Sequence, residues 1–178
     1  MARYISTDGA GLGFTVDAID VVTKGGAGGP RVATCGFSQG FALGGRRHGR
    51  IAVAVEMDGA DWQDDAPMNR RAGRAAVPAL RQLASAILAG GGDGQVERDI
   101  RRRGVCTVSF RHVGAAPDGR PFDRRAVIYL DVRMAGTEPD AELIGRAAPA
   151  AAKALERLAG DIHGALDSRQ LASVFGAG

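Results

Sequence analysis

The sequence predicts an α+β fold in which two tandem ββα repeats form a mostly antiparallel sheet with helices on one face, plus an N-terminal β-hairpin. Strand-like segments occur in pairs separated by glycine-rich turns, and a long segment with helical spacing follows each pair. The first half of the chain resembles the second half at a nearly constant offset. At 178 residues, the chain has the size of a single domain with its own core.

The N-terminal hairpin is predicted to occupy residues 1–29. Residues 3–7 and 14–22 have strand character, and the glycines between them permit a turn. The apolar alternation of the second segment slips by one residue near Ala18, which indicates a β-bulge. Residues 23–30 are rich in glycine and are predicted to form a loop.

The first ββα repeat is predicted at residues 30–92. Its strands are expected at residues 31–37 and 50–57, with a loop at residues 44–49. Its helix is predicted over residues 68–89, where apolar side chains recur at spacings of three and four residues. Pro78 lies inside this pattern, so the helix is expected either to begin near Val77 or to kink there.

The second ββα repeat is predicted at residues 93–163. Its elements are expected to be a short charged helix at residues 95–103, strands at 104–113 and 125–134, and a long helix. Thr137 is the expected N-cap of that helix, and Pro149 interrupts its apolar stripe as Pro78 interrupts the first. Residues 164–178 are predicted to form a C-terminal tail helix.

The internal repeat rests on three pairs of similar segments. Residues 73–83 resemble 145–155, residues 31–37 align with 104–110, and residues 50–57 align with 125–132. Neither unit can bury its apolar sheet face and helix stripe alone, so the two units are expected to pair about a pseudo-twofold axis. The resulting sheet would still have open edges and a second face, which a second copy of the chain could close. A homo-oligomer is therefore predicted.

The net charge of +3 is too small to attract the whole protein to nucleic acid or to a membrane. Only Lys24 and Lys153 are lysines, and the other basic residues are arginines. The arginines cluster at Arg46, Arg47 and Arg50, at Arg70, Arg71 and Arg74, and at Arg98, Arg101, Arg102 and Arg103. No aromatic side chains that could stack on bases interleave with these clusters. We therefore expect neither a nucleic-acid nor a membrane partner.

The cysteine content favours a reducing compartment. Cys35 and Cys106 are too few for a disulfide framework. The N-terminal residues have no basic-then-apolar pattern, and the apolar stretches are far shorter than the ~20 residues of a membrane span. The expected location is the cytoplasm, with no secretory signal.

The segment Gly36–Gly40 reads G-F-S-Q-G and directly follows a strand-like segment. It resembles the G-x-S-x-G nucleophile elbow of the α/β-hydrolases, particularly the small carboxylesterases. The resemblance covers about ten residues and implies that Ser38 is a nucleophile. In that family the elbow opens a helix and several strands precede it, whereas here more glycines and a strand follow. The alternative interpretation is a strand end with a glycine-rich turn.

Cys35 offers a second candidate nucleophile, with His48 as the cation that a reactive thiolate needs. The alternative is that Cys35 and Cys106 are small buried apolar side chains. The three histidines lie in separate elements without metal-ligand spacing. We therefore expect no metal ion and no cofactor.

The densest group of acids follows the second strand of the first repeat. It comprises Glu56, Asp58, Asp61, Asp64 and Asp65, and the only tryptophan, Trp62, lies among them. Their spacing does not match an EF-hand, so a solvated loop that caps the following helix is expected. An exposed indole at Trp62 would suggest a ligand or subunit contact.

These observations favour an oligomeric small-molecule-binding protein whose ligand is anionic and whose site lies at a repeat or subunit interface. The candidate ligand-binding residues are Arg46, Arg47, Arg50, Asp58, Asp61 and Trp62. One alternative function is a small hydrolase that uses Ser38 or Cys35 with His48. A second alternative is a structural assembly component, because repeats and open sheet edges also suit a ring or shell.

Overall fold

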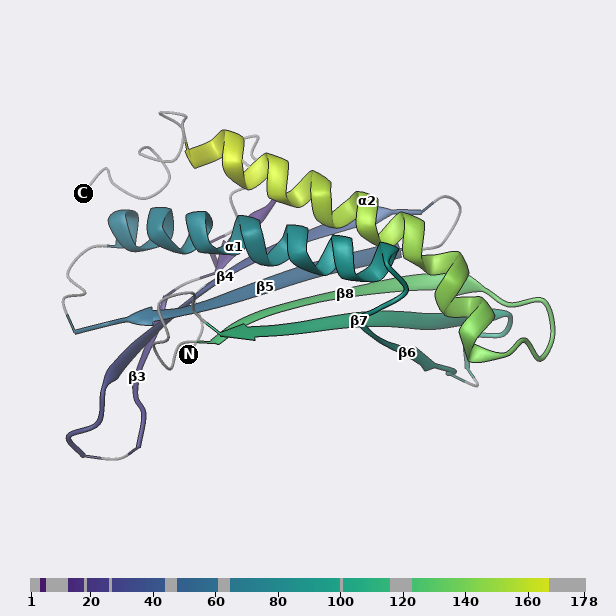
Figure 1. Cartoon of the computed structure of the whole chain (residues 1–178), viewed down its shortest axis with the longest axis horizontal. Helices are drawn as coiled ribbons and strands as arrows, with labels where there is room; N and C mark the ends of the chain where they lie inside the picture. The colour runs from purple at the N-terminus through teal and green to yellow at the C-terminus, as the bar shows by residue number, and fades with distance from the viewer. Residues whose placement is uncertain are drawn as a thin grey trace.

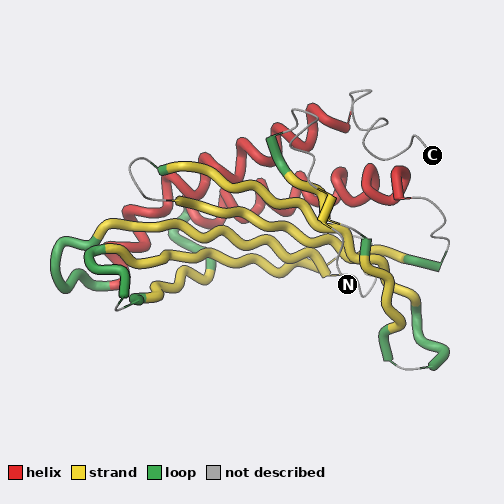
Figure 2. The backbone as a smooth tube through the Cα atoms, turned by 180° about the vertical axis from the view of Figure 1, so that it is seen from behind, coloured by secondary structure: helices red, strands yellow, loops and turns green. Residues whose placement is uncertain are grey.

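In the computed structural model, the described part of the chain forms an antiparallel sheet of eight strands with two helices on one of its faces (Figure 1). The structure describes residues 4–5, 13–17, 19–25, 27–43, 48–60, 65–99, 101–115 and 123–166. Seen from behind, the other face of the sheet is turned to the viewer and neither helix covers it (Figure 2). The fold class is therefore α+β with a mostly antiparallel, open sheet, as predicted.

The elements follow one another in a regular order. They are β1 (Tyr4–Ile5), β2 (Thr15–Asp17), β3 (Asp20–Thr23), β4 (Arg31–Ala42), β5 (His48–Asp58), α1 (Asp65–Leu88), β6 (Asp93–Glu97), β7 (Val105–Ala115), β8 (Asp123–Arg133) and α2 (Asp140–Leu166). The order of strands across the sheet is β1-β2-β4-β5-β8-β7-β6, and β3 also pairs with β4. A hairpin formed by β3 and the start of β4 projects beyond the helix-covered part of the sheet (Figures 1 and 2).

Alternation of side chains along the central strands explains which face the helices cover. Phe37, Val53 and Ala126 lie opposite one another on β4, β5 and β8, and all three are buried. Ile51, Ile128 and Phe110 form the neighbouring buried row. The residues between them point to the other face, as the period of two requires.

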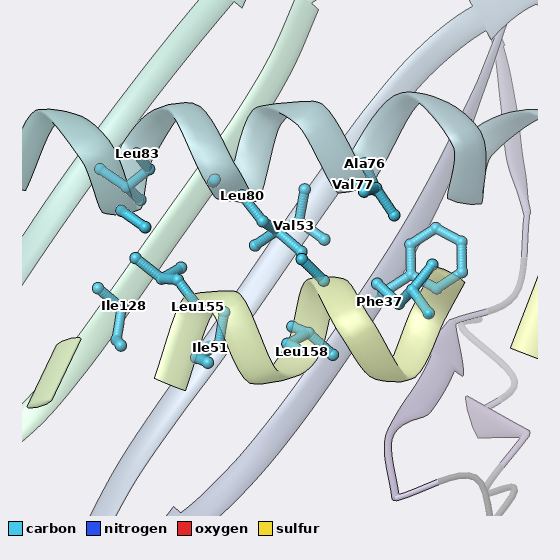
Figure 3. Packing of buried hydrophobic residues seen from close by; sticks show 14 of the residues in the cluster. Phe37, Ile51, Val53, Ala76, Val77, Leu80, Leu83, Ile128, Leu155 and Leu158 are labelled. Carbon is cyan, nitrogen blue, oxygen red and sulfur yellow. The ribbon is translucent and has the colours of Figure 1, made fainter. Parts of the chain in front are cut away.

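The two helices bury their apolar stripes on these rows. Leu80 and Leu83 of α1 and Leu155 and Leu158 of α2 are fully buried and pack above the sheet (Figure 3). Burial of one such leucine stabilises the fold by about 1.5–3 kcal/mol. Alanines fill many of the remaining buried helix positions, which allows α1 and α2 to lie side by side on the sheet (Figure 1).

Both prolines lie within continuous helices. Pro78 is inside α1 and Pro149 is inside α2, and both side chains are exposed. Because α1 begins at Asp65, the predicted start near Val77 is wrong.

The N-terminal strands agree with the predicted hairpin. Tyr4 pairs with Asp17, so β1 and β2 are antiparallel neighbours. Val16 and Asp20 are four residues apart, whereas their partners on β4, Phe37 and Thr34, are only three residues apart. One extra residue therefore lies between β2 and β3, as a β-bulge would require, and Ala18 itself lies outside the described residues.

One predicted element is wrong. Residues 95–103 were expected to form a charged helix, but Asp93–Glu97 is the edge strand β6, paired with β7. Residues 101–104 then form a turn into β7. The first three residues of the tail helix predicted at 164–178 belong to α2, which continues to Leu166. The rest of the tail and residues 44–47 of the loop predicted at 44–49 lie outside the described residues, and residues 48–49 belong to β5.

The order strand–strand–helix occurs twice, as β4–β5–α1 and as β7–β8–α2, and β6 is additional. β5 and β8 are neighbours in the sheet, and α1 packs against α2. The internal duplication itself stays a prediction. Neither α1 nor α2, the helices in the described part of the chain, combines the length and apolar character needed to cross a membrane.

Candidate ligand-binding groove

The structure does not bring the candidate catalytic residues together. Gly36–Gly40 lies within β4, so the strand-to-helix turn of a nucleophile elbow is not formed there. Ser38 and His48 share the open face, but His48 pairs with Ala42, which is four residues or about 13 Å along β4 from Ser38. Cys35 is buried on the helix-covered face. A Ser–His or Cys–His hydrogen bond is therefore out of range.

Two of the predicted ligand-binding residues are described in full, and they lie far apart. Arg50 is exposed on the open face of β5, which begins at His48, two residues before the predicted strand start. Asp58 is the last residue of β5, and its Oδ1 accepts a hydrogen bond from the Ala60 amide at 3.0 Å. Eight residues of extended chain separate them by about 26 Å. Arg46, Arg47, Asp61 and Trp62 lie outside the described residues.

Other polar groups near these positions have structural partners. Glu56 accepts hydrogen bonds from Lys24 Nζ at 2.6 Å and from the Asp123 amide at 3.0 Å, which ties the β3–β4 hairpin to β5 and β8. Burial raises the pKa of Asp17, and the nearby charge of Arg50 opposes this increase. Because Lys24 and the Asp123 amide both bond to the Glu56 carboxylate, this group is not free to bind a ligand.

The described part of the chain contains two adjoining cavities between α2 and the sheet, which we call the β4–α2 groove. One has a volume of about 250 Å³ and the other about 270 Å³. The first is lined by Leu43, Leu130, Asp131, Val132, Arg133, Arg146, Ala147 and Ala150, and the second by Gln39, Phe41, Ala42, Leu43, Ala150, Lys153, Ala154 and Arg157. Leu43 and Ala150 border both cavities, and each cavity is slightly smaller than the ~300–1,000 Å³ of typical ligand pockets.

The amino-acid sequence of α2 explains why this space exists. Ala147, Ala150 and Ala154 face the groove, so α2 offers methyl groups where longer side chains would fill the gap to the sheet. Phe41 and Leu43 supply the apolar surface on the strand side. The groove therefore has apolar walls that water wets poorly.

Three cationic residues of α2 border the groove and form what we call the cationic stripe. Arg146, Lys153 and Arg157 are spaced by seven and four residues, which places them along one side of the helix. Arg146 Nη2 donates to Glu138 Oε2 at 2.9 Å and to the Arg133 carbonyl at 2.8 Å. Arg157 Nε lies 4.0 Å from Asp161 Oδ2, at the limit of an ion pair.

Lys153 differs from its two neighbours. No acid among the described residues lies within ion-pair distance of its ammonium group, and its side chain is exposed. Exposed ion pairs such as that of Arg157 contribute only about 0–1 kcal/mol, so Arg157 can exchange its partner at little cost. The stripe therefore presents at least one uncompensated positive charge beside an apolar cavity.

Asp131 anchors one end of the groove. Its carboxylate accepts hydrogen bonds from Arg102 Nη1 at 2.9 Å and Nη2 at 2.5 Å, and from the His48 amide at 3.3 Å. The hydrogen bond from Arg102 lowers the pKa of Asp131, and the His48 amide acts in the same direction against the effect of burial. The Asp131 carboxylate is thus paired with Arg102 and does not neutralise the cationic stripe.

Gln39 anchors the other end. Its side chain is buried, and Nε2 donates to the Gly13 carbonyl at 2.7 Å and to Asp161 Oδ2 at 3.0 Å. These bonds connect β4 to α2 and to the segment that precedes β2. At this end, the Gln39 side chain therefore ties α2 to β4.

Beyond Ser38, which pairs with Thr15 of β2, the outer edge of β4 has no strand neighbour among the described residues. Gly13, which precedes β2, lies beside this part of β4, because its carbonyl accepts the hydrogen bond from Gln39 Nε2.

No protein-family model, curated protein or solved structure matches the chain. Among the described residues, no three histidine, cysteine, aspartate or glutamate side chains gather as metal ligands. The groove must therefore be interpreted from its own geometry.

The groove was missed at the level of sequence. The spacing of Arg146, Lys153 and Arg157 was available as a signal, because it places cations along one side of a helix otherwise rich in alanine. Nothing in the sequence indicates that this side borders Phe41 and Leu43, because the contact joins segments more than 100 residues apart.

Proposed function

We propose that the protein binds an anionic ligand with a short apolar portion in the β4–α2 groove. The observation that carries this proposal is the position of Lys153, an exposed cation without an acidic partner among the described residues, beside a cavity walled by Phe41, Leu43 and alanines. An apolar pocket with few polar groups at its border is the usual form of a small-molecule site.

The ligand class follows from the two parts of the groove. A carboxylate or phosphate group would lie at the cationic stripe, where charge-assisted hydrogen bonds are strongest. A hydrocarbon portion would lie against Leu43 and Ala150, at the junction of the two cavities. β4 belongs to the first half of the chain and α2 to the second, so this location is consistent with the expected site between the two halves.

Octanoate, octyl phosphate and the neutral octanol are suitable probes. At a ligand concentration 100 times the Kd, binding stabilises the native state by about 2.7 kcal/mol. For a domain of this size the melting temperature then rises by about 5–11 °C. We expect this rise with the two anions and a much smaller one with octanol, as measured by thermal unfolding and titration calorimetry.

Variants of the stripe locate the binding site. Lys153→Gln should weaken octanoate binding about tenfold, which corresponds to about 1.4 kcal/mol. Ala150→Phe should abolish it, because the new ring fills the junction between the cavities. Arg74→Gln on α1 is the matched control, since Arg74 is exposed and does not border the groove. Equal binding by Lys153→Gln and the control would contradict the proposal.

No observation in the described part of the chain favours the hydrolase, because Ser38, Cys35 and His48 are not brought together.

A further inference from the structure

The exposed surface of α1 is much more basic than the protein as a whole. α1 contains Arg70, Arg71, Arg74 and Arg81, all of them exposed, and its first residue, Asp65, is its only acid. The acids on the described strands, which offset these arginines in the net charge of +3, are Asp17, Asp20, Glu56, Asp58, Asp93, Glu97, Asp123 and Asp131. The fold therefore separates positive charge on α1 from negative charge on the sheet.

Three of these arginines form a row along one side of α1, which we call the α1 arginine row. Arg70, Arg74 and Arg81 are separated by four and seven residues, which places them within about 40° of one another around the helix and over about 16 Å along it. Arg81 Nε lies 3.7 Å from Glu156 Oε2 of α2, so the row follows the side of α1 next to α2. Arg71 lies beside the row on the exposed surface of the same helix.

The charges of the row are available to a partner. Arg70, Arg71 and Arg74 make no ion pair and no side-chain hydrogen bond with a described residue. Arg81 has Glu156 as its neighbour, but both side chains are more than half exposed, and ion pairs of this kind are weak in water. Arg81 can therefore exchange Glu156 for another anion.

The length and chemistry of the row match a nucleic-acid backbone. Each strand of a duplex carries one phosphate per about 3.4 Å of its axis, so a row of about 16 Å extends over about five phosphates. The cations are all arginines, whose planar guanidinium groups can form two parallel hydrogen bonds with one phosphate. A polyanion with regularly spaced phosphates therefore complements this surface in charge and length.

The surroundings of the row favour a duplex over a membrane or unstacked bases. A helix that lies in a membrane surface inserts its apolar side, but the apolar side of α1 is buried on the sheet. Of the exposed large apolar side chains among the described residues, only Leu88 belongs to α1, and it lies about 10 Å beyond Arg81 along the helix. α1 also has no aromatic residue that could stack on a base.

We propose that the α1 arginine row, together with Arg71, binds the phosphate backbone of double-stranded nucleic acid without reading its sequence. The expectation that nucleic acid is not a partner used the net charge, which averages over the whole chain, and the lack of aromatic side chains, which duplex phosphates do not require. This surface is separate from the β4–α2 groove, because no residue of α1 lines either cavity.

Fluorescence anisotropy of a labelled 20-base-pair DNA duplex, titrated with the full chain, tests the proposal. In 50 mM NaCl we expect a Kd of about 1–10 µM. Four phosphate contacts should give a slope of about −3.6 for the logarithm of the binding constant against the logarithm of the salt concentration, which is a loss of about 150-fold between 50 and 200 mM NaCl. Two duplexes of unrelated sequence should bind within about threefold of each other. No binding at about 100 µM protein in 50 mM NaCl would overturn the proposal.

Matched variants locate the contact. Arg70→Gln/Arg74→Gln/Arg81→Gln should weaken duplex binding at least 30-fold and bring the salt slope to about −0.9. The control Arg101→Gln/Arg103→Gln/Arg111→Gln removes the same charge from three exposed positions outside α1 and should weaken binding less than threefold. An equal loss in the two triple variants would reveal a general effect of net charge and overturn the assignment to α1.

Two further measurements separate a binding role of the row from a structural one. Arg70→Lys/Arg74→Lys/Arg81→Lys keeps the charge, so it should keep the salt slope and lose only the affinity that depends on the planar guanidinium. Glutamine has a helix propensity close to that of arginine, so the glutamine variant should unfold at the wild-type temperature. A salt slope in the lysine variant as small as in the glutamine variant would contradict phosphate binding by the row.

Vesicles of phosphatidylcholine with 30% phosphatidylserine provide the comparison with a membrane. Because α1 offers no apolar side chain beside the row, we expect at least tenfold weaker binding to these vesicles than to the duplex, at equal total anion concentration in 50 mM NaCl. Vesicle binding that equals or exceeds duplex binding would overturn the proposal in favour of a lipid surface.

Discussion

Replacement of Arg102 by alanine is expected to destabilise the protein although Arg102 lies on the surface. Its guanidinium makes two hydrogen bonds, at 2.9 and 2.5 Å, to Asp131, whose side chain is only 10% exposed. Without Arg102, the Asp131 carboxylate keeps only the His48 amide as a donor, at 3.3 Å. The variant thus strands a nearly buried charge at one end of the groove.

The magnitude follows from these contacts. Breaking a fully buried ion pair from one side costs about 3–5 kcal/mol, and stranding a single polar group costs about 1–3 kcal/mol. Arg102 is 42% exposed, so water replaces part of what is lost, and we expect about 2 kcal/mol at pH 7. For a domain of this size the melting temperature should fall by about 4–8 °C.

The pH dependence supplies a second measurement. Arg102 holds the pKa of Asp131 below its ordinary value of 3.8, so the pair stabilises the native state above that pH. This contribution is lost as the pH falls through the depressed native pKa. In the variant, burial without Arg102 favours the protonated acid. The difference in unfolding free energy between wild type and variant should therefore be largest near pH 7 and shrink towards pH 3.

Urea unfolding at both pH values, with Arg101→Ala as the control, measures the effect. Arg101 is exposed and its side chain makes no hydrogen bond with a described residue, so its loss should change stability by at most about 0.5 kcal/mol. The double variant Arg102→Ala/Asp131→Asn should be more stable than Arg102→Ala alone, because it removes the stranded charge. If Arg102→Ala unfolds like Arg101→Ala, the reasoning about the pair is refuted.

Two further variants or probes test the packing. Cys35 and Cys106 are at most 1% exposed, and burial raises the pKa of Cys106. Neither thiol should therefore react with a thiol reagent at pH 8 in the native protein, and both should react in urea. Rapid labelling of Cys35 in the native protein would instead support its role as a nucleophile. Gly49→Ala should lower stability by about 1–3 kcal/mol and also weaken octanoate binding, because a Cβ at Gly49 would overlap the ring of Phe41, which lines the groove. An unchanged melting temperature would show that Phe41 moves aside freely.

The local patterns predicted most of the secondary structure. The apolar stripes at Leu80 and Leu155 lie on α1 and α2, and the strand pairs are β4–β5 and β7–β8. The exception is β6 (Asp93–Glu97), which overlaps the short charged helix predicted at residues 95–103. β6 is a strand because β7 supplies a pairing edge, and that edge is not visible in the local sequence.

The candidate site was not predicted, for a related reason. Sequence reasoning placed it where arginines and acids are dense, around Arg50 and Asp58, and the strand geometry separates these residues by about 26 Å. The groove instead combines Phe41 with Lys153, which are far apart in the chain. Their proximity depends on the path of α2 across the sheet, which no periodicity encodes.

The sequence by itself determined the fold class, the antiparallel pairing of the main strands and the apolar faces of both helices. These follow from side-chain periodicity and turn residues, which act over a few neighbours. Only the tertiary structure decided where space remains. A cavity is what is left when long-range packing is complete, and here it lies between the alanines of α2 and the last residues of β4.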